Sequence, residues 1–288
     1  MKIKTLLATS GILALAATTN AATLGYTTGL DVWLDASDID GTNNSSLLDN
    51  DPVFNWANKG TTGVNDAVTV LTGAGGDSDG TYLAGGGNGG QDAIGLDNTR
   101  FQFGQEFMDS TSVTMYFVVN QNGSATAQGT LFTDYGDVSN KLLNLRTADG
   151  SAGAYRRDGA GATNTVAHTG ALATSGWATI FYSYDAATDT ATWGELGSTN
   201  SATNAAFDET TTFEGTHGGP VTLFSFHDGN NGFDFNGMTS EVLIYDHLLD
   251  AGQRSQVESY LAAKVVPEPS SAALLGLGGL ALILRRRK

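Results

Sequence analysis

Hydrophobic and polar positions alternate in this chain over short stretches, which clusters of glycine, asparagine and aspartate separate. Residues 113–119 form a nearly continuous β-branched and aromatic run, typical of a strand buried on both faces. Residues 177–184 and 190–196 flank the polar segment 185–189 and predict a hairpin. Further strand patterns lie at residues 30–34, 142–145, 221–226 and 241–245. Together they predict an all-β sandwich of two antiparallel sheets.

Two stretches carry more local predictions. Leu30, Val32 and Leu34 alternate with polar or aromatic neighbours, so we expect them to share one aliphatic face of a strand. Residues 72–91 are rich in glycine and predict an exposed loop.

One helical pattern occurs near the end of the chain. Asp250 is a favourable N-cap, and Gln253 three residues later completes a capping-box pattern. The helix is expected to run to about Lys264 and to pack on the sandwich through one apolar face, formed by Val257, Tyr260 and Leu261.

The N-terminus has the pattern of a secretory signal peptide. Lys2 and Lys4 precede an apolar stretch at residues 6–17, and small residues follow at 19–22. We therefore predict a signal peptide at residues 1–22 and a single folded domain at residues 23–266.

The C-terminal segment, residues 267–288, has three parts. A proline pair, an apolar run at residues 272–284 and a basic terminus follow one another. The candidate sorting-signal residues are Pro267, Glu268, Pro269, Arg285, Arg286 and Arg287, and Lys288 completes the basic terminus. As a helix the run would be about 20 Å long, against a hydrocarbon core of about 30 Å. We expect transient membrane insertion, with the basic end on the cytoplasmic side.

The charge of the chain changes when both ends are removed. The whole chain has 30 acidic and 14 basic residues, and the ends hold six of the bases and one of the acids. Residues 23–266 therefore carry 29 acids and 8 bases, a net charge of −21. This charge disfavours binding to nucleic acid and to anionic lipid headgroups, and it favours divalent cations.

Several kinds of catalytic site lack support in the sequence. Cysteine is absent, which excludes thiolate nucleophiles and disulfides. The histidines His168, His217, His227 and His247 do not have zinc-site spacing. A retaining glycosidase needs two carboxylates about 5 Å apart, and no pair of glutamates on an expected strand has suitable spacing. A pair of aspartates from separate loops stays open.

Two kinds of ligand contact remain as hypotheses. Calcium needs several oxygen ligands from loops, and Asp38, Asp40 and Asp228 lie in oxygen-rich loop sequences. The alternative for these aspartates is a set of Asx turns. Trp193 is a candidate for stacking on a sugar ring, although a tryptophan in a strand more often belongs to the core.

Two resemblances extend this interpretation. The C-terminal segment resembles a PEP-CTERM sorting tail, which implies an exosortase as the partner that recognises and cleaves it. Residues 30–41, 56–60, 91–98 and 235–246, with the helix start at residues 248–254, resemble landmarks of LamG-like (concanavalin A-like) jelly rolls. The second resemblance implies carbohydrate or protein binding, often with Ca²⁺, and some relatives on this fold are glycosidases.

The sequence thus predicts a protein exported from a Gram-negative-type bacterium to its envelope, outer surface or extracellular matrix. Its expected partners are the exosortase and extracellular polysaccharide or surface proteins, and we expect no nucleic acid. A non-catalytic binding domain is the favoured role, and Ca²⁺ is the candidate ion. The alternatives are a polysaccharide hydrolase or lyase, and a structural surface protein without a specific ligand.

Overall fold

The computed structural model describes residues 23–69, 78–104, 112–121, 129–136, 141–147, 153–157, 163–167, 176–203, 221–225 and 234–265. From Leu24 onward these residues belong to one compact unit. The expected signal peptide, residues 1–22, and the expected sorting tail, residues 267–288, lie outside the described residues.

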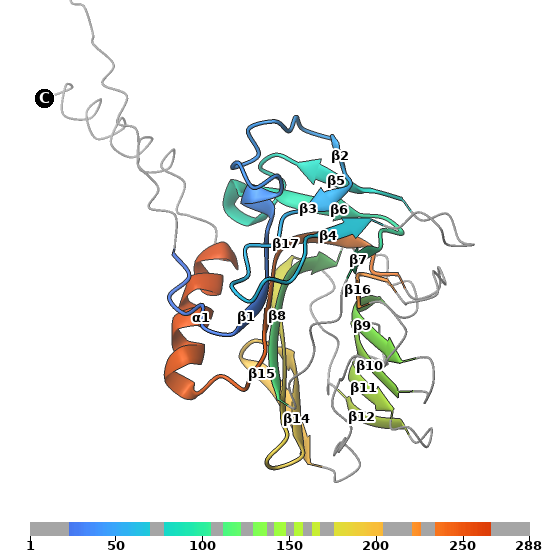
Figure 1. The fold of residues 1–288 in the computed structure, drawn as a ribbon, viewed down its shortest axis with the longest axis vertical. Coiled ribbons are helices and arrows are strands. Elements are labelled where there is room, and N and C mark those ends of the chain that lie inside the picture. Colours follow the sequence, from blue (N-terminus) through green and yellow to red (C-terminus); the bar gives the residue numbers. More distant parts are fainter. Residues whose placement is uncertain are drawn as a thin grey trace, which may run out of the picture. The chain divides into compact units, whose positions relative to one another are not determined.

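Two antiparallel β-sheets build the domain, which confirms the predicted sandwich (Figure 1). The first sheet has nine strands in the order β15-β14-β13-β8-β17-β6-β5-β2, with β1 paired to β17. Its strands are β1 (Leu30–Asp35), β2 (Pro52–Val53), β5 (Gly80–Leu83), β6 (Ala93–Leu96), β8 (Val113–Gln121), β13 (Trp177–Asp185), β14 (Thr190–Glu195), β15 (Ser198–Thr203) and β17 (Gly237–Tyr245).

The second sheet has eight strands in the order β12-β11-β10-β9-β16-β7-β4-β3. They are β3 (Asn55–Trp56), β4 (Ala67–Thr69), β7 (Phe101–Phe103), β9 (Thr130–Gly136), β10 (Lys141–Arg146), β11 (Gly153–Arg157), β12 (Thr163–Ala167) and β16 (Thr222–Leu223). Two short 3₁₀ turns, η1 (Ala36–Asp38) and η2 (Asn88–Gly90), and one α-helix, α1 (Ala251–Val265), complete the described elements.

Strand β17 organises the first sheet. It pairs with β8 along its whole length, whereas β6 and β1 follow one another along its other edge. The change of partner coincides with a register shift between Thr239 and Glu241. A β-bulge of this kind bends a strand and redirects its side chains, so two short strands can continue one another beside a long one.

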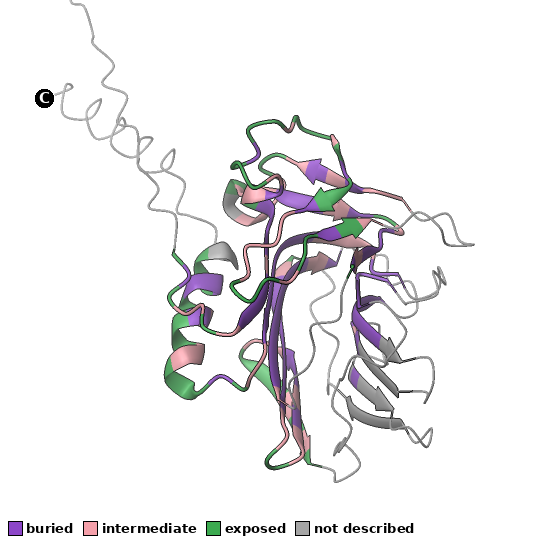
Figure 2. Cartoon of the chain, viewed as in Figure 1, coloured by how far each residue is buried: buried purple, intermediate pink, exposed green. Residues whose placement is uncertain are grey.

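The core lies on both sides of the first sheet. One apolar cluster fills the space between the two sheets and includes Phe117, Tyr182 and Leu223. A second cluster lies between the outer face of the first sheet and α1, and includes Tyr116, Phe181 and Leu243. The central strands β8, β13 and β17 are therefore buried on both faces (Figure 2). This confirms the prediction made from the continuous apolar run at residues 113–119.

Strand β1 departs from the simple alternation that its sequence indicates. Val32 and Leu34 face the cluster between the sheets, but Leu30 lies in the cluster under α1 together with Trp33. A register shift between Leu30 and Val32 explains the difference, because an extra residue turns the following side chains to the other face. The prediction of a single aliphatic face for these three residues was wrong.

Two other predictions need correction, and one is confirmed. The segment 72–91 is not one exposed loop, because it contains β5 with Tyr82 buried. The strand expected at residues 221–226 is shorter than predicted: within the described residues 221–225, only the two residues of β16 form a strand. The predicted hairpin is present as β13 and β14, paired from Ile180 and Glu195 to Asp185 and Thr190.

Candidate functional site

Trp193 lies in the cluster between the two sheets, and its exposed fraction is 0%. A ring that stacks on a sugar must be open to solvent. The position of Trp193 therefore contradicts the hypothesis that it binds a ligand directly. Its strand β14 lies next to the edge strand β15, and the strand position alone did not decide which sheet face the ring occupies.

An exposed aromatic side chain lies instead at the edge of the sandwich. Phe54 is 58% exposed, and no other aromatic side chain in the described part of the chain is classed as exposed. It connects β2 to β3, which are the end strands of the first and the second sheet. The chain crosses between the layers at this point, so the ring of Phe54 is left on the rim of the fold.

Polar side chains surround this rim. Asn55 donates its amide N–H to Asp66 Oδ2 at 3.1 Å. Thr69, whose backbone N–H donates to the carbonyl oxygen of Phe54, donates its hydroxyl to Asp79 Oδ1 at 2.8 Å. Val68 beside them is 41% exposed. A segment that carries an exposed ring and has amide, hydroxyl and carboxylate groups on neighbouring and paired residues offers the kinds of contact that a sugar needs. The sequence analysis missed Phe54.

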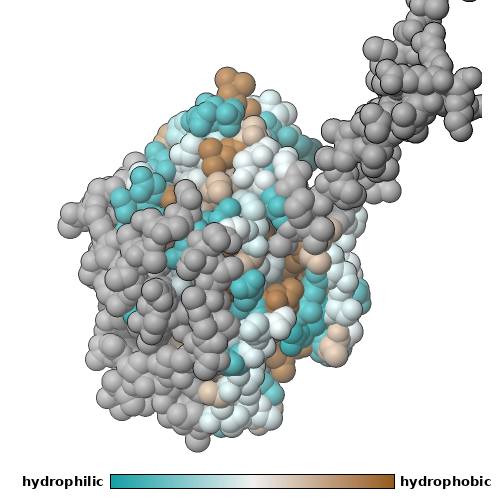
Figure 3. Space-filling view, turned by 180° about the vertical axis from the view of Figure 1, so that it is seen from behind, coloured by the Kyte–Doolittle hydropathy of each residue, from teal (hydrophilic) through white to brown (hydrophobic). Residues whose placement is uncertain are grey.

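Exposed apolar residues elsewhere are dispersed. In the view of Figure 3 the apolar patches on the described surface are small and separated by polar surface. The large apolar side chains that are exposed in the described residues are Leu48, Phe54, Val68 and Leu248.

The loop that follows η1 brings Asp38 and Asp40 close together, as the calcium hypothesis requires, but both carboxylates have protein partners. Asp40 Oδ1 accepts the backbone N–H groups of Thr42 and Asn44, and its Oδ2 accepts the Ser46 hydroxyl at 2.6 Å. Asp38 Oδ1 accepts the backbone N–H of Asn43 at 2.7 Å. The bond from Thr42 to Asp40 is that of an Asx turn, and the other bonds extend the same carboxylate capping over the loop.

A lysine supplies the positive charge in this region. Lys59 Nζ lies 3.2 Å from Asp35 Oδ2 and 3.3 Å from Asp38 Oδ2. It also lies 4.5 Å from the centre of the Trp33 ring. A cation in this position neutralises part of the acidic loop, which lessens the attraction of the loop for a metal ion.

Within the described residues, no group of three or more acidic or histidine side chains is arranged to hold a metal ion. Asp228, the third candidate ligand, lies outside those residues, as do His168, His217 and His227. A calcium site at Asp38, Asp40 and Asp228 therefore stays a prediction.

The buried carboxylate of Glu241 connects the sheet to the helix. Its exposed fraction is 0%, and its Oε1 accepts the indole N–H of Trp33 at 2.8 Å. The hydroxyl of Tyr260 on α1 donates to the same oxygen. Burial, followed by the negative charge of Glu241, raises the pKa of Tyr260. The hydroxyl thus stays protonated and able to donate, so this arrangement fastens α1 to β17.

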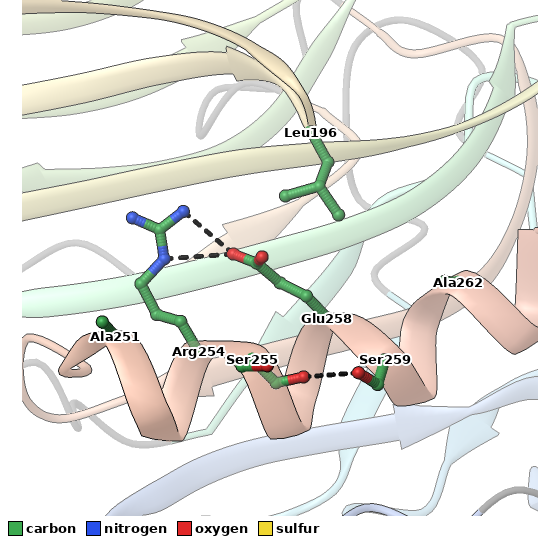
Figure 4. A pocket seen from close by; sticks show the side chains of 7 residues that line it. All are labelled: Leu196, Ala251, Arg254, Ser255, Glu258, Ser259 and Ala262. Carbon is green, nitrogen blue, oxygen red and sulfur yellow. Dashed lines mark hydrogen bonds and ion pairs between the residues drawn. The ribbon is translucent and has the colours of Figure 1, made fainter.

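An open groove of about 540 Å³ lies beside α1. Arg254 and Glu258 point from the helix toward Leu196 at the end of β14 (Figure 4). The Arg254 guanidinium donates two hydrogen bonds to Glu258 Oε1, at 3.0 and 2.9 Å, and lies 4.4 Å from the centre of the Phe181 ring. Arg254 and Glu258 thus form an ion pair on the helix surface. The other residues that line the groove are Ala251, Ser255, Ser259 and Ala262.

The sequence of the tail matches a known family. Residues 265–288 match the PEP-CTERM protein-sorting motif. This match confirms the expected motif, and it implies recognition by an exosortase and export through the membrane to the cell envelope. The described residues include no helix that is long and apolar enough to cross a membrane. The apolar run at 272–284 lies outside them.

A comparison with curated protein sequences found no match. Among solved structures, the chain is similar to domain 4 of AbnA, a GH43 extracellular arabinanase from Geobacillus stearothermophilus, in complex with arabinotriose. The TM-score is 0.54 and the identity 16%, over 80% of this chain and 97% of that domain. At this identity the likeness shows the fold alone.

Two further similar structures have lower TM-scores. NanB of Streptococcus pneumoniae, with optactamide, gives a TM-score of 0.46 at 17% identity, over 59% of this chain and 27% of that chain. The CBM40 of the Ruminococcus gnavus IT-sialidase, bound to α2,3 sialyllactose, gives a TM-score of 0.42 at 15% identity. The match covers 53% of this chain and 84% of that chain. The chain thus spans only 27% of the length of NanB.

Proposed function

We propose that the domain is an exported, non-catalytic β-sandwich that binds carbohydrate or protein in the cell envelope or extracellular matrix. The observation that carries this proposal is the sorting motif at residues 265–288 directly after the sandwich. The similarity to an arabinanase domain in complex with arabinotriose supports a sugar as the ligand. The LamG-like landmarks agree with the same architecture.

The proposed route uses both ends of the chain. The leader at residues 1–22 directs export, and the apolar run at 272–284 then pauses in the inner membrane. The exosortase removes the tail after recognising Pro267, Glu268 and Pro269. The mature domain then acts outside the membrane, where its net charge of −21 keeps it soluble and away from nucleic acid.

The proposed binding site is the rim around Phe54. The exposed ring stacks on the apolar face of a sugar, and Asn55, Asp66, Thr69 and Asp79 exchange hydrogen bonds with its hydroxyl groups. Calcium is a second proposed component, held by acidic loops that include Asp38, Asp40 and Asp228. It would bridge protein carboxylates and sugar hydroxyls.

The first experiment tests the sugar site with the mature protein on a glycan array. Phe54→Ala is compared with Leu48→Ala, which truncates a side chain that is even more exposed, at 73%. We expect Phe54→Ala to weaken binding roughly fivefold, because a stacked ring is worth about 1 kcal/mol. Leu48→Ala should bind like wild type.

The same array separates the alternatives. Loss of signal in EGTA supports the calcium component. No signal with any glycan, with or without EGTA, contradicts sugar binding and favours a structural role. Release of new reducing ends from polysaccharide would show a hydrolase and overturn the non-catalytic proposal.

A further inference from the structure

The sorting signal begins where the last helix of the domain ends. Helix α1 extends to Val265, and the residues that match the sorting motif start at 265. Pro267 is the second residue after the helix. The sequence therefore offers almost no linker between the folded domain and the signal that the sorting enzyme has to read.

The helix is held firmly up to its next-to-last turn. Val257 and Leu261 have exposed fractions of 0%, and Tyr260 is 4% exposed and bonded to Glu241. After Leu261, the next two residues of the helix, Ala262 and Ala263, are exposed. Unwinding α1 after Leu261 leaves the buried positions Val257, Tyr260 and Leu261 in place.

Opening this turn gives the tail more reach. Four helical residues, 262–265, cover about 6 Å at about 1.5 Å each, and about 14 Å when extended. From Val265 to the start of the apolar run at residue 272, an extended chain covers at most about 25 Å. An enzyme that closes around Pro267–Pro269 must fit between the domain and the membrane within this short length.

We infer that the last turn of α1 restrains tail removal, so that the fraction of molecules in which this turn is open sets the rate at which the sorting enzyme reaches Pro267–Pro269. The inference rests on the proposed function, because it assumes that this enzyme processes the tail. When opening is fast compared with cleavage, the rate follows the population of the open form. The stability of the helix end then controls how long the domain stays at the membrane.

A spacer and a pair of glycines test this inference in cells that contain the sorting system. A six-residue Gly-Ser spacer after Val266 should speed tail removal roughly fivefold or more, in pulse-chase measurements on the full chain. The control carries the same spacer between Ala186 and Ala187, in the turn of the β13–β14 hairpin, and should be processed at the wild-type rate.

The glycine pair changes only the helix end. Ala262→Gly with Ala263→Gly weakens the exposed last turn and should speed processing roughly tenfold. The matched control, Ser255→Gly with Gln256→Gly, alters two exposed positions nearer the start of the same helix and should have less than a third of that effect. Thermal unfolding of each mature protein verifies that the core is retained.

The outcomes separate this inference from the proposed function. If Pro267→Ala with Pro269→Ala blocks tail removal but the spacer and the glycine pair leave its rate unchanged, the restraint is refuted and the sorting route stands. If the proline variant loses its tail as fast as wild type, the sorting route fails, and the inference fails with it. Equal acceleration by both glycine pairs would also overturn the inference, because the effect would not belong to the last turn.

Discussion

At the scale of the residue, aspartate side chains stabilise several loops of this protein by accepting hydrogen bonds from nearby backbone and hydroxyl groups. Asp35 Oδ1 caps η1 by accepting the backbone N–H of Ser37, and Asp185 accepts the backbone N–H of Ala187 in the hairpin turn. Asp40 organises the loop after η1 through both carboxylate oxygens. The acidic composition thus reflects local hydrogen bonding, in addition to any role in ligand binding.

Asp40 provides a pH-dependent prediction. The hydrogen bond from the Ser46 side chain, with further bonds from Thr42, holds the pKa of Asp40 well below its ordinary value of 3.8. A lowered pKa in the folded state adds stability above pH 3.8, and this stability is lost as the pH falls further. We expect Asp40→Asn to lower Tm at pH 7, and the difference from wild type to shrink below about pH 4.

Differential scanning calorimetry across this pH range measures the effect. Asp97→Asn is the control, because it removes the same charge from an exposed carboxylate that has no such loop hydrogen bonds in the described residues. An equal loss of Tm in the two variants at pH 7 would attribute the effect to net charge instead of the loop.

At the scale of the element, α1 shows how local and tertiary signals combine. Asp250 Oδ1 accepts the backbone N–H groups of Gly252 and Gln253, and Gln253 Oε1 accepts the backbone N–H of Asp250. This is the capping box that the sequence predicts. The apolar face with Val257 and Leu261 is also as predicted. The bond from Tyr260 to Glu241 is a tertiary contact that the helical pattern does not reveal.

Removing the cap should loosen the helix without disturbing its apolar face. Asp250→Ala is expected to cost about 1 kcal/mol, because it leaves helix N–H groups without their side-chain acceptor. For a domain of this size the loss corresponds to a fall in Tm of about 2–4 °C. Asp250→Asn retains an oxygen acceptor and should stay near the wild-type Tm, so a similar loss in both variants would contradict the capping explanation.

The interface between α1 and the sheet should also be sensitive to alkali. Burial raises the pKa of Tyr116, Tyr245 and Tyr260, and nearby charges add to the effect. A raised pKa in the folded state leaves stability intact below the ordinary value near 10, and stability falls as the pH rises above it.

Unfolding should therefore accompany tyrosinate formation above about pH 10, measured together by circular dichroism and ultraviolet absorbance. Tyr260→Phe removes one of the three ionising groups and should make the alkaline decline of Tm less steep. A steeper decline in this variant would contradict the assignment.

At the scale of the whole molecule, charge and layering set the behaviour of the sandwich domain. The described part has a helix on one face of the first sheet and a second sheet on the other (Figure 1). Residues 23–266 contain no cysteine and carry a net charge of −21. Without disulfides, the two apolar clusters have to outweigh this repulsion.

Salt should therefore stabilise the mature protein. We expect Tm to rise by a few degrees between 10 and 150 mM NaCl, because the Debye length falls from about 30 Å to about 8 Å at 0.15 M. CaCl₂ at equal ionic strength is the control that separates screening from a bound ion. A Tm that stays constant in NaCl would show that repulsion between surface charges is not significant.

The sequence by itself determined the features that depend on neighbours along the chain. These are the β13–β14 hairpin, the start and apolar face of α1, the long buried strand β8 and the sorting motif that follows the domain. Short-range hydrogen bonds and periodicity are sufficient for all of them.

Only the tertiary structure decided which way particular side chains face. A register shift placed Leu30 under the helix, a partner sheet enclosed Trp193, and the crossing between two edge strands exposed Phe54. Strands β2 and β3 have two residues each, which is too short for a pattern of hydrophobic and polar positions to predict them. Their pairing with β5 and β4 defines them. The candidate site depends on such pairings, since a one-residue change of register reverses the face of every side chain.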